Sequence, residues 1–561
     1  MSEENDDDYI DPIPYFEPLS DAQPGENKNN ALKDLDWREI INSLPIEDEK
    51  PSGRGRYALL AVLGAILIIA ASSIALFYYL KPSSVATIKL PASTFRYSST
   101  CPFQPGEGII VGQQLKCGIL QVPEDRSSSQ TKMIQLAVAI YKSPQTSAPS
   151  DPILFLDGGP GAGALDDLGT YLTLKNLDGV ALGHDLILLD QRGTGYSKPA
   201  LSCHELQDLQ RNSRLFGSGQ NWEQMYLNAV QACHNRLVAS GINLNAYTTI
   251  DNATDVHDLV HALGYRQVNL DGVSYGTRLA LTVMRLFPGD IRSVILDSTV
   301  PTQANVFNDT PTVTQHALDV LFAGCSANSH CHMAYPDLQK VFYSLVTALN
   351  NNPVTLRAPG SDQPVQLDGD SLLDWVYNGM YVTELIPRLP AIIMQVDHGS
   401  YDLIAKYFVP ITSNAGINDG MYWSVECGED MDFTTEQQLA HAANVLHPEI
   451  NPSVLGGLLV DLDTCKVWNQ KPVPVEQKQP VTSSVPTLIL SGEYDPITPK
   501  TYAEQVKQSL NRSFLFSFPA TGHGVLTTNP CPDSIASAFL LNPGISPDAS
   551  CVASMSEPNF L

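Results

Sequence analysis

Basic side chains are scarce in this sequence. Its 561 residues include 33 lysine and arginine residues against 60 aspartate and glutamate residues, which gives a net charge of −27. Because nucleic-acid-binding proteins need a basic face, this balance excludes that class of function. The composition is otherwise globular, with 43% apolar and 17% charged residues. The length favours two or more structural units over a single core.

Cysteine is absent from the first hundred residues, whereas the rest of the chain contains ten. An even number confined to one part of a chain is typical of disulfide bonds in an oxidising compartment. The sequence does not fix their connectivity, but the simplest pairing joins neighbours in order: Cys101–Cys117, Cys203–Cys233, Cys325–Cys331, Cys427–Cys465 and Cys531–Cys551. A C-x-x-C pair is also missing, so we expect no zinc site or other metal centre.

Charged residues are missing altogether from Tyr57 to Leu80, a stretch of 24 residues. A helix of that length spans a bilayer. Arg54 and Arg56 precede the stretch and Lys81 alone follows it directly, so we expect the N-terminus on the cytoplasmic side. A cleavable signal peptide is the alternative, but it would have a shorter apolar core nearer the N-terminus. The sequence predicts a single-pass membrane protein whose body is periplasmic or extracellular.

The segment before this stretch is strongly acidic. Residues 1–50 contain 15 acidic and 4 basic side chains, a net charge of −11. Such a composition is typical of a disordered, solvated tail. The alternative is a docking segment for a cytosolic partner, with residues 9–16 (YIDPIPYF) as its candidate core.

Apolar strands and helices alternate after the uncharged stretch. The expected strands are residues 132–141, 151–156, 184–190, 267–271, 291–297, 485–492 and 514–518. Near-continuous apolar strands separated by helices indicate a mostly parallel sheet that is covered on both faces. Between residues 301 and 480 the pattern is mainly helical, which predicts a cap inserted into an α/β core. The expected segments are a tail (1–56), a transmembrane helix (57–80), the first half of the core (81–300), the cap (301–480) and the second half of the core (481–561).

The pentapeptide GVSYG at residues 272–276 lies between a predicted strand and a predicted helix. Its glycines permit a turn too tight for side chains, and the turn exposes Ser274 at a helix N-terminus, where developing negative charge is favoured. Strand, G-x-S-x-G and helix together are the nucleophile elbow of α/β-hydrolases. We therefore expect an α/β-hydrolase fold in which Ser274 is the nucleophile.

A serine nucleophile needs a base, and in this fold the chain order is serine, acid, histidine. Asp495 follows the resumed strand, and His523 follows the next strand. His523 would take the proton of Ser274, while Asp495 would orient the imidazole and stabilise its charged form. No cofactor is expected for this chemistry.

Each member of this pair also has a simpler interpretation. An aspartate before proline is often a turn former, and a Gly-His-Gly sequence is often only a loop. Rival candidates are Glu493 for the acid, and His398 and His447 for the base.

An oxyanion needs two backbone N–H donors aimed at it. Tyr275 follows the nucleophile and would supply the first, and Gly158 or Gly159 of the early glycine-rich loop would supply the second. The alternatives for this loop are a plain tight turn or a phosphate cradle, but the P-loop lysine is missing.

Several motifs together resemble a known family. The sequences DGGPG at 157–161 and DQRGTGYS at 190–197 are similar to two signatures of proline iminopeptidases. The elbow region, and GHGV at 522–525 with the nearby Cys531, resemble the tripeptidyl aminopeptidases of that group and their C-terminal domain. The resemblance covers roughly residues 95–560.

This resemblance implies a serine exopeptidase that acts on free N-termini. Asp157 stands where the iminopeptidases have histidine, which leaves the backbone donors intact but puts the substrate preference in doubt. Family members bind the substrate ammonium with carboxylates of the cap. The corresponding candidates are Glu426, Glu429 and Asp430, of which Glu429 matches the pattern best. A solvated acidic loop is the alternative.

Three functions therefore compete. The first is a membrane-anchored serine aminopeptidase with a peptide substrate, and the second is an esterase or lipase acting on a small-molecule ester with the same triad. Acids in the cap would favour the former, and an apolar tunnel the latter. A catalytically inactive scaffold is the third, and the intact triad argues against it.

Overall fold

The computed structural model describes residues 91–106, 108–144, 151–165, 179–213, 222–357, 364–407 and 416–561. The predicted acidic tail (1–56) and transmembrane segment (57–80) lie outside these residues. Among the helices that are described, none combines the length and hydrophobicity that crossing a bilayer requires. All described residues belong to the second of two units, Ile88–Leu561.

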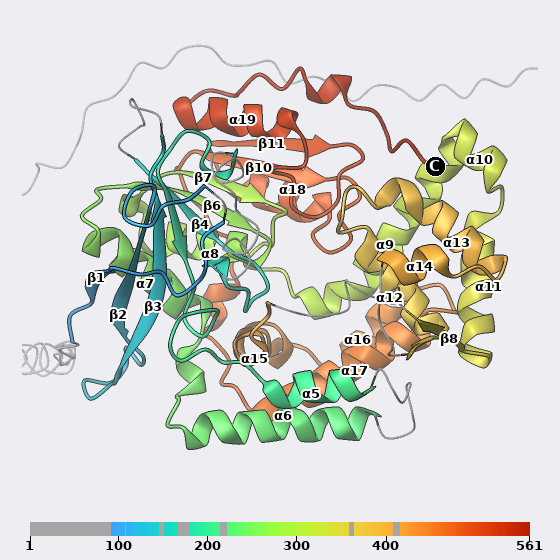
Figure 1. Ribbon diagram of the computed structural model, residues 1–561, viewed down its shortest axis with the longest axis horizontal. Coiled ribbons are helices and arrows are strands. Elements are labelled where there is room, and N and C mark those ends of the chain that lie inside the picture. Colours follow the sequence, from blue (N-terminus) through green and yellow to red (C-terminus); the bar gives the residue numbers. More distant parts are fainter. Residues whose placement is uncertain are drawn as a thin grey trace, which may run out of the picture. The chain divides into compact units, whose positions relative to one another are not determined.

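A nine-stranded sheet forms the centre of the described unit, in the order β1-β2-β3-β5-β4-β6-β7-β10-β11 (Figure 1). Its strands are β1 (Thr94–Ser98), β2 (Leu115–Pro123), β3 (Met133–Tyr141), β4 (Ile153–Leu156), β5 (Leu186–Leu189), β6 (Val268–Val273), β7 (Ile291–Asp297), β10 (Thr487–Gly492) and β11 (Ser513–Phe518). The first three strands pair antiparallel, as do β3 and β5, and the remaining pairs are parallel. The expected α/β fold with a mostly parallel sheet is confirmed.

All seven strands predicted from the sequence are present, whereas β1 and β2 were not predicted. β1 is five residues long and mostly exposed, so it shows no buried apolar run. β2 interrupts its apolar residues with Lys116, Gly118 and Gln121. These antiparallel edge strands therefore lack the continuous hydrophobicity that marks the central strands.

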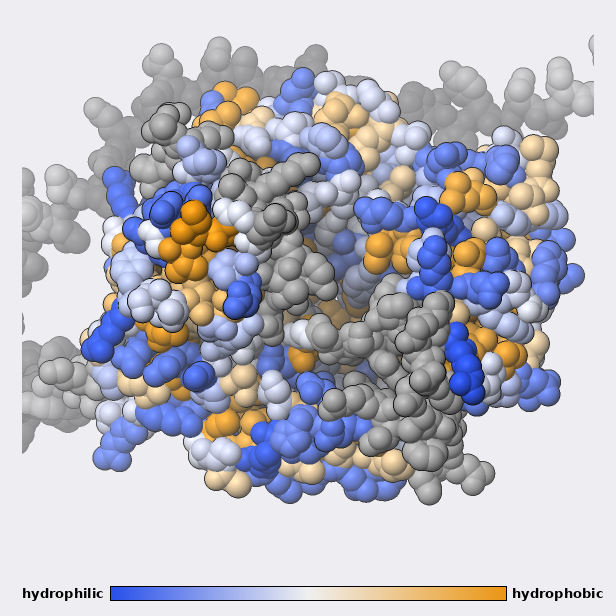
Figure 2. All heavy atoms as spheres, viewed as in Figure 1, coloured by the Kyte–Doolittle hydropathy of each residue, from blue (hydrophilic) through white to orange (hydrophobic). Residues whose placement is uncertain are grey.

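Helices cover both faces of the sheet. On one face Leu154 and Leu270 pack in one core with residues of α7 (Thr249–Ala262), α8 (Tyr275–Leu286) and α18 (Lys500–Ser509). On the other face Ile153 and Leu488 pack against α19 (Pro530–Leu541). The view in Figure 2 shows hydrophilic residues over most of the surface, with hydrophobic ones in small separate groups, as is common for a surface in contact with water.

The chain between β7 and β10 is mainly helical and has a core of its own. Its elements are α9 (Val306–Ala327), α10 (Ser329–Ala334), α11 (Leu338–Asn351), the hairpin of β8 (Val354–Arg357) and β9 (Pro364–Leu367), α12 (Gly369–Gly379), α13 (Leu389–Asp397), α14 (Asp402–Tyr407), α15 (Asp419–Glu429), α16 (Glu436–Ala442) and α17 (Asn451–Trp468). Two earlier helices, α5 (His204–Ser213) and α6 (Trp222–Ala239), lie beside α15 and α17 (Figure 1). Val230 of α6 shares a core with Met421 and Trp468. The helical region between β7 and β10 therefore also packs against helices that precede residue 301.

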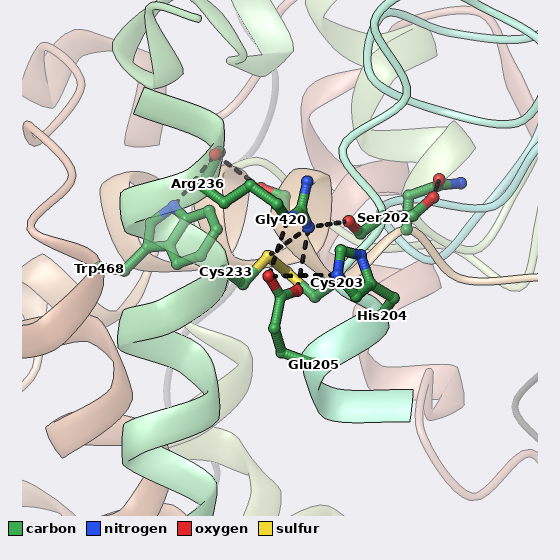
Figure 3. The surroundings of a disulfide bond; sticks show 10 residues. Ser202, Cys203, His204, Glu205, Cys233, Arg236, Gly420 and Trp468 are labelled. Carbon is green, nitrogen blue, oxygen red and sulfur yellow. Dashed lines mark hydrogen bonds and ion pairs between the residues drawn. A yellow bond between two sulfur atoms is a disulfide. The ribbon is translucent and has the colours of Figure 1, made fainter. Parts of the chain in front are cut away.

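All ten cysteines form disulfides, in the five pairs expected from their order. Figure 3 shows the Cys203–Cys233 bond, beside which Arg236 binds the carboxylate of Glu205 at 2.7 and 3.0 Å and the carbonyl oxygen of Ser202 at 2.8 Å. This bond joins the start of α5 to α6. Five disulfides indicate an oxidising, extracytoplasmic environment for this body.

Candidate active site

The turn at Ser274 has the backbone geometry that the motif predicts. Ser274 has φ +57° and ψ −125°, a conformation that costs energy in any residue but glycine. A Cβ atom on Gly272 would lie 2.5 Å from the carbonyl oxygen of Gly276, and one on Gly276 would lie 1.9 Å from that of Leu156. Only glycine fits at either position, so the turn can raise the serine above the end of the sheet.

Asp495 and His523 are in direct contact. The Nδ1 atom of His523 lies 2.9 and 3.0 Å from the two carboxylate oxygens of Asp495. Asp495 also accepts hydrogen bonds from the N–H groups of Ile497 and Thr498 and from the Thr498 hydroxyl. The aspartate is therefore both a turn former and the partner of the histidine, so the two interpretations of the sequence are compatible.

The electrostatics of this pair suit a general base. Burial by itself lowers the pKa of His523, but the charge of Asp495 and the hydrogen bond to it outweigh burial and raise that pKa above its ordinary value. Burial by itself raises the pKa of Asp495. The positive charge of His523 and the hydrogen bond between the two side chains outweigh burial, so the pKa of Asp495 lies below its ordinary value. The pair is arranged to stabilise an imidazolium beside a carboxylate.

The loop of His523 is held by the cap. The N–H of His523 donates to the carbonyl oxygen of Tyr381, which lies between α12 and α13, and the two rings are 4.9 Å apart. The N–H of Gly522 donates to the Thr383 hydroxyl. Tyr381 was not predicted, and nothing in the sequence around it distinguishes it from other aromatic residues of the cap.

A cavity of about 690 Å³ brings Ser274 and His523 together with Gly158 and Gly159. It is lined by Asp157, Gly158, Gly159, Tyr226, Val273, Ser274, Asn378, Tyr381, Ile417, Asp419, Tyr422, Trp423 and His523. Within this described region no hydrogen bond joins Ser274 to His523, a contact that in many enzymes tightens only in the substrate complex. None of the rivals lines the cavity: Glu493 and His398 are exposed, and His447 stacks on Tyr343 within the cap.

The glycine-rich loop lies against the nucleophile, since a Cβ atom on Gly158 would be 3.0 Å from that of Ser274. The N–H of Gly158 donates to the carboxylate of Asp157 at 2.7 Å. Within the described chain, neither the N–H of Gly159 nor that of Tyr275 donates to another group of the protein. Of the three predicted oxyanion donors, Gly159 and Tyr275 are therefore the pair available to a substrate.

The second signature, residues 190–197, supports this loop. Gln191 donates from Nε2 to the carbonyl oxygen of Asp157 at 2.9 Å. Arg192 is fully buried and binds the carboxylate of Asp255 on α7 through two hydrogen bonds of 2.7 Å. The sequence revealed this signature but not that its side chains hold the loop in place.

The three predicted amine anchors all lie at the end of α15, and none lines the cavity. Asp430 binds Arg278 at 3.1 Å and also pairs with Lys478. Glu429 accepts hydrogen bonds from the N–H and hydroxyl of Thr249, at 2.7 and 2.8 Å. Both carboxylates thus already have partners within the protein.

Glu426 differs from these two because its Oε2 atom is buried without a hydrogen-bond partner. Burial, and next the charge of Asp430, raise the pKa of Glu426 to about 8. Two turns earlier on α15, Asp419 lines the cavity and its Oδ2 atom is likewise buried and unpartnered. Burial raises its pKa to about 6, although backbone N–H groups, including that of the disulfide-bonded Cys203, partly offset this.

Asp419, Tyr422 and Glu426 follow one another at intervals of three and four residues, which places them on one face of α15. Asp419 was not predicted as a site residue. Its unpaired buried oxygen is a tertiary feature, and the only signal in the sequence is its spacing from Glu426.

Comparisons with known proteins show the family to which this chain belongs. Residues 151–530 match the family described as alpha/beta hydrolase fold. The chain is 25% identical over 452 residues to the tripeptidyl aminopeptidase of Streptomyces coelicolor, covering 77% of this chain and 81% of that protein. It is also 25% identical over 452 residues to the serine protease Hip1 of Mycobacterium tuberculosis, covering 76% and 85%.

Among solved structures, the proline iminopeptidase of Mycobacterium smegmatis aligns over 76% of this chain and 98% of its own, with 14% identity and a TM-score of 0.34. The family match covers more than half of the sequence, and its range includes Ser274, Asp495 and His523. The protein is a serine hydrolase, and the chain belongs to the alpha/beta hydrolase fold family.

Proposed function

We propose that this protein is a serine aminopeptidase that releases single residues or di- and tripeptides from free N-termini through an acyl-enzyme. The observation that carries the proposal is that Asp419 of α15 lines the same cavity as Ser274 and has one carboxylate oxygen, Oδ2, that is buried without a hydrogen-bond partner. A substrate ammonium would complete its hydrogen bonds, and charge-assisted bonds are the strong ones.

The reaction follows from the arrangement of the triad. Ser274 Oγ attacks the scissile carbonyl carbon while His523 accepts the hydroxyl proton, and Asp495 remains ionised and stabilises the imidazolium. The oxyanion receives hydrogen bonds from the N–H groups of Gly159 and Tyr275. As the C–N bond breaks, His523 returns its proton to the leaving amine. Water then attacks the acyl-enzyme with the same base, releasing the acid and regenerating Ser274.

The cavity limits what can bind. Its volume of about 690 Å³ lies within the range of sites that enclose small ligands. Two carboxylates, Asp157 and Asp419, are part of its lining. A cavity that contains two acidic side chains, one of them with a buried and unpartnered oxygen, favours a short peptide with a positively charged end over a neutral acyl chain, because an acyl chain would leave that polar atom unpaired. The structure therefore favours the peptidase over the esterase hypothesis.

The cellular placement is part of the same proposal. The uncharged stretch 57–80 would anchor the protein with its N-terminus in the cytoplasm. The five disulfides support a catalytic body on the oxidising side of that membrane. The acidic tail remains the candidate segment for a cytosolic partner.

Two experiments test the proposal. A fluorophosphonate probe is expected to label the full-length protein but not Ser274→Ala, and equal labelling would refute the nucleophile. Peptide amides with free N-termini are expected to be cleaved, and their acetylated versions are not. Equal turnover of the two, or turnover of ester substrates alone, would reject the aminopeptidase and leave the esterase.

A further inference from the structure

Two histidines and an aspartate meet on the surface away from the catalytic cavity. His257 and His261 are one turn apart on α7, and Asp290 ends the short 3₁₀ helix Pro288–Asp290 that precedes β7. One Asp290 oxygen lies 2.6 Å from Nδ1 of His257, and the other lies 3.2 Å from Nε2 of His261. All three ligand atoms lie within 4.8 Å of one another.

The donor set determines which ion would fit. Two imidazole nitrogens and one carboxylate are ligands that suit zinc and other late first-row divalent ions, whereas magnesium and calcium prefer oxygen ligands alone. Zinc sites with three protein ligands leave a fourth position for water. The histidine rings are exposed by 32% and 56%, so an ion can reach the cluster from solvent.

The cluster is partly preorganised. The ring of His257 stacks on Phe287 at 4.2 Å with an interplanar angle of 16°, and its edge meets His261 at 4.4 Å. A ring held in this way loses less rotational freedom when it binds an ion. The carboxylate of Asp290 is 13% exposed and already faces both rings. The net charge of −27 also attracts cations to the protein.

We propose that His257, His261 and Asp290 form a zinc-binding site. Zinc replaces the two histidine–carboxylate hydrogen bonds and joins α7 to the connection between α8 and β7. It binds the folded chain only, because unfolding separates the residues, and at one hundred times its dissociation constant it shifts the unfolding equilibrium about one hundredfold. Cysteine spacing predicts no metal site in this chain, but it carries no information about this cluster, because the fold brings Asp290 to the two histidines.

The simpler interpretation is a pair of surface histidine–aspartate hydrogen bonds that bind no ion. Zinc titration calorimetry of the metal-free, full-length protein and its variants distinguishes the two. We expect His261→Ala, His257→Ala and Asp290→Asn each to weaken one zinc-binding event by about tenfold or more. Mutating residues that merely hydrogen-bond to metal ligands already lowers metal affinity by about that much. His398→Ala, which removes an exposed histidine of the cap, is the matched control and is expected to bind as the parent does.

A second measurement keeps the test decisive if a variant is unstable. Cobalt added to the parent is expected to give the visible absorption of a four-coordinate site, and His261→Ala, whose ring is the more exposed, is expected to lose it. Zinc is expected to raise the melting temperature of the parent and of His398→Ala, but not of the cluster variants. Equal zinc affinity in the parent and all three cluster variants, or no binding to the parent, overturns the proposal.

Discussion

Asp297 holds the backbone N–H of Val525 with both of its carboxylate oxygens, at 2.8 and 2.9 Å. The N–H of Leu526 donates to the same carboxylate at 2.9 Å. The carbonyl oxygen of Asp297 in turn accepts the N–H of Ser274 at 3.0 Å. One buried residue at the end of β7 therefore binds both the backbone of Ser274 and the loop that carries His523.

Asp297→Asn is expected to lower kcat about one hundredfold, the cost of misplacing catalytic groups by about 1 Å. Asparagine has one acceptor oxygen and an NH₂ group that cannot accept from the loop, so the loop must shift. Steady-state kinetics should show a smaller change in KM than in kcat. The matched control is Asp533→Asn, since Asp533 accepts a hydrogen bond from the N–H of Thr527, which is further along the chain from His523 than Val525 and Leu526 are. Identical kinetics in the parent and Asp297→Asn would contradict this positioning role.

The pH dependence of catalysis is expected to report on His523. Its neutral form accepts the serine proton, so kcat/KM should rise as the pH passes the pKa of His523, which Asp495 holds above the ordinary value. Asp495→Asn removes the charge that raises this pKa, so the acidic limb should move to lower pH. The same change should reduce kcat by about 10⁴-fold, because the imidazole loses its orientation. An acidic limb at an unchanged pH would show that another group controls it.

The central strands and the elbow could be predicted because their causes are local. The apolar run before Gly272 predicts a buried strand, and the crowding around Gly272 and Gly276 allows only glycine. Asp495 and His523 could be proposed because the order serine, acid, histidine and the ends of the strands point to them. The structure places the two side chains in contact.

The roles of the cap residues could not be predicted because they depend on partners far away in the sequence. The sequence does not distinguish Glu426, Glu429 and Asp430 from one another. In the structure Asp430 pairs with Arg278 and Lys478, and Glu429 binds Thr249. The Oε2 atom of Glu426 is left without a hydrogen-bond partner. Asp297 and Tyr381 likewise act through backbone groups of residues 522–526, which no sequence pattern reveals. Tertiary pairing thus determines which acids remain available for a substrate.

Stability should decrease as the pH rises through the pKa of Asp271. Burial, and secondarily the charge of Asp297, raise the pKa of Asp271 from 3.8 to about 8. The folded state therefore favours its protonated form, and this contribution is fully present below about pH 4 and lost as the pH passes about 8. Asp271→Asn mimics the neutral carboxyl, so it should match the parent near pH 4. It should become progressively more stable than the parent as the pH rises to about 8, and at pH 9 the difference should be a few kcal/mol, on the scale of about 1.4 kcal/mol per pKa unit.

Thermal unfolding of the two proteins between pH 4 and pH 9 measures this difference. The melting temperatures should diverge between about pH 4 and pH 8 and keep a constant separation above that range. Asp533→Asn again serves as a control. Parallel curves for the parent and Asp271→Asn would show that Asp271 is ionised at neutral pH in the folded protein.

Mutating two acids associated with α15 should have different effects, one on substrate binding and the other on stability. Asp419 lines the cavity with an unpartnered oxygen, so Asp419→Asn should raise KM for free N-terminal peptides by about 10- to 100-fold, the value of a charge-assisted hydrogen bond, with little change in melting temperature. Asp430 pairs with the buried Arg278, so Asp430→Asn should cost about 3 kcal/mol of stability by leaving that charge uncompensated. If Asp430→Asn instead weakened peptide binding in a stable protein while Asp419→Asn had no effect, the substrate ammonium would bind at the end of α15, as the family resemblance predicts.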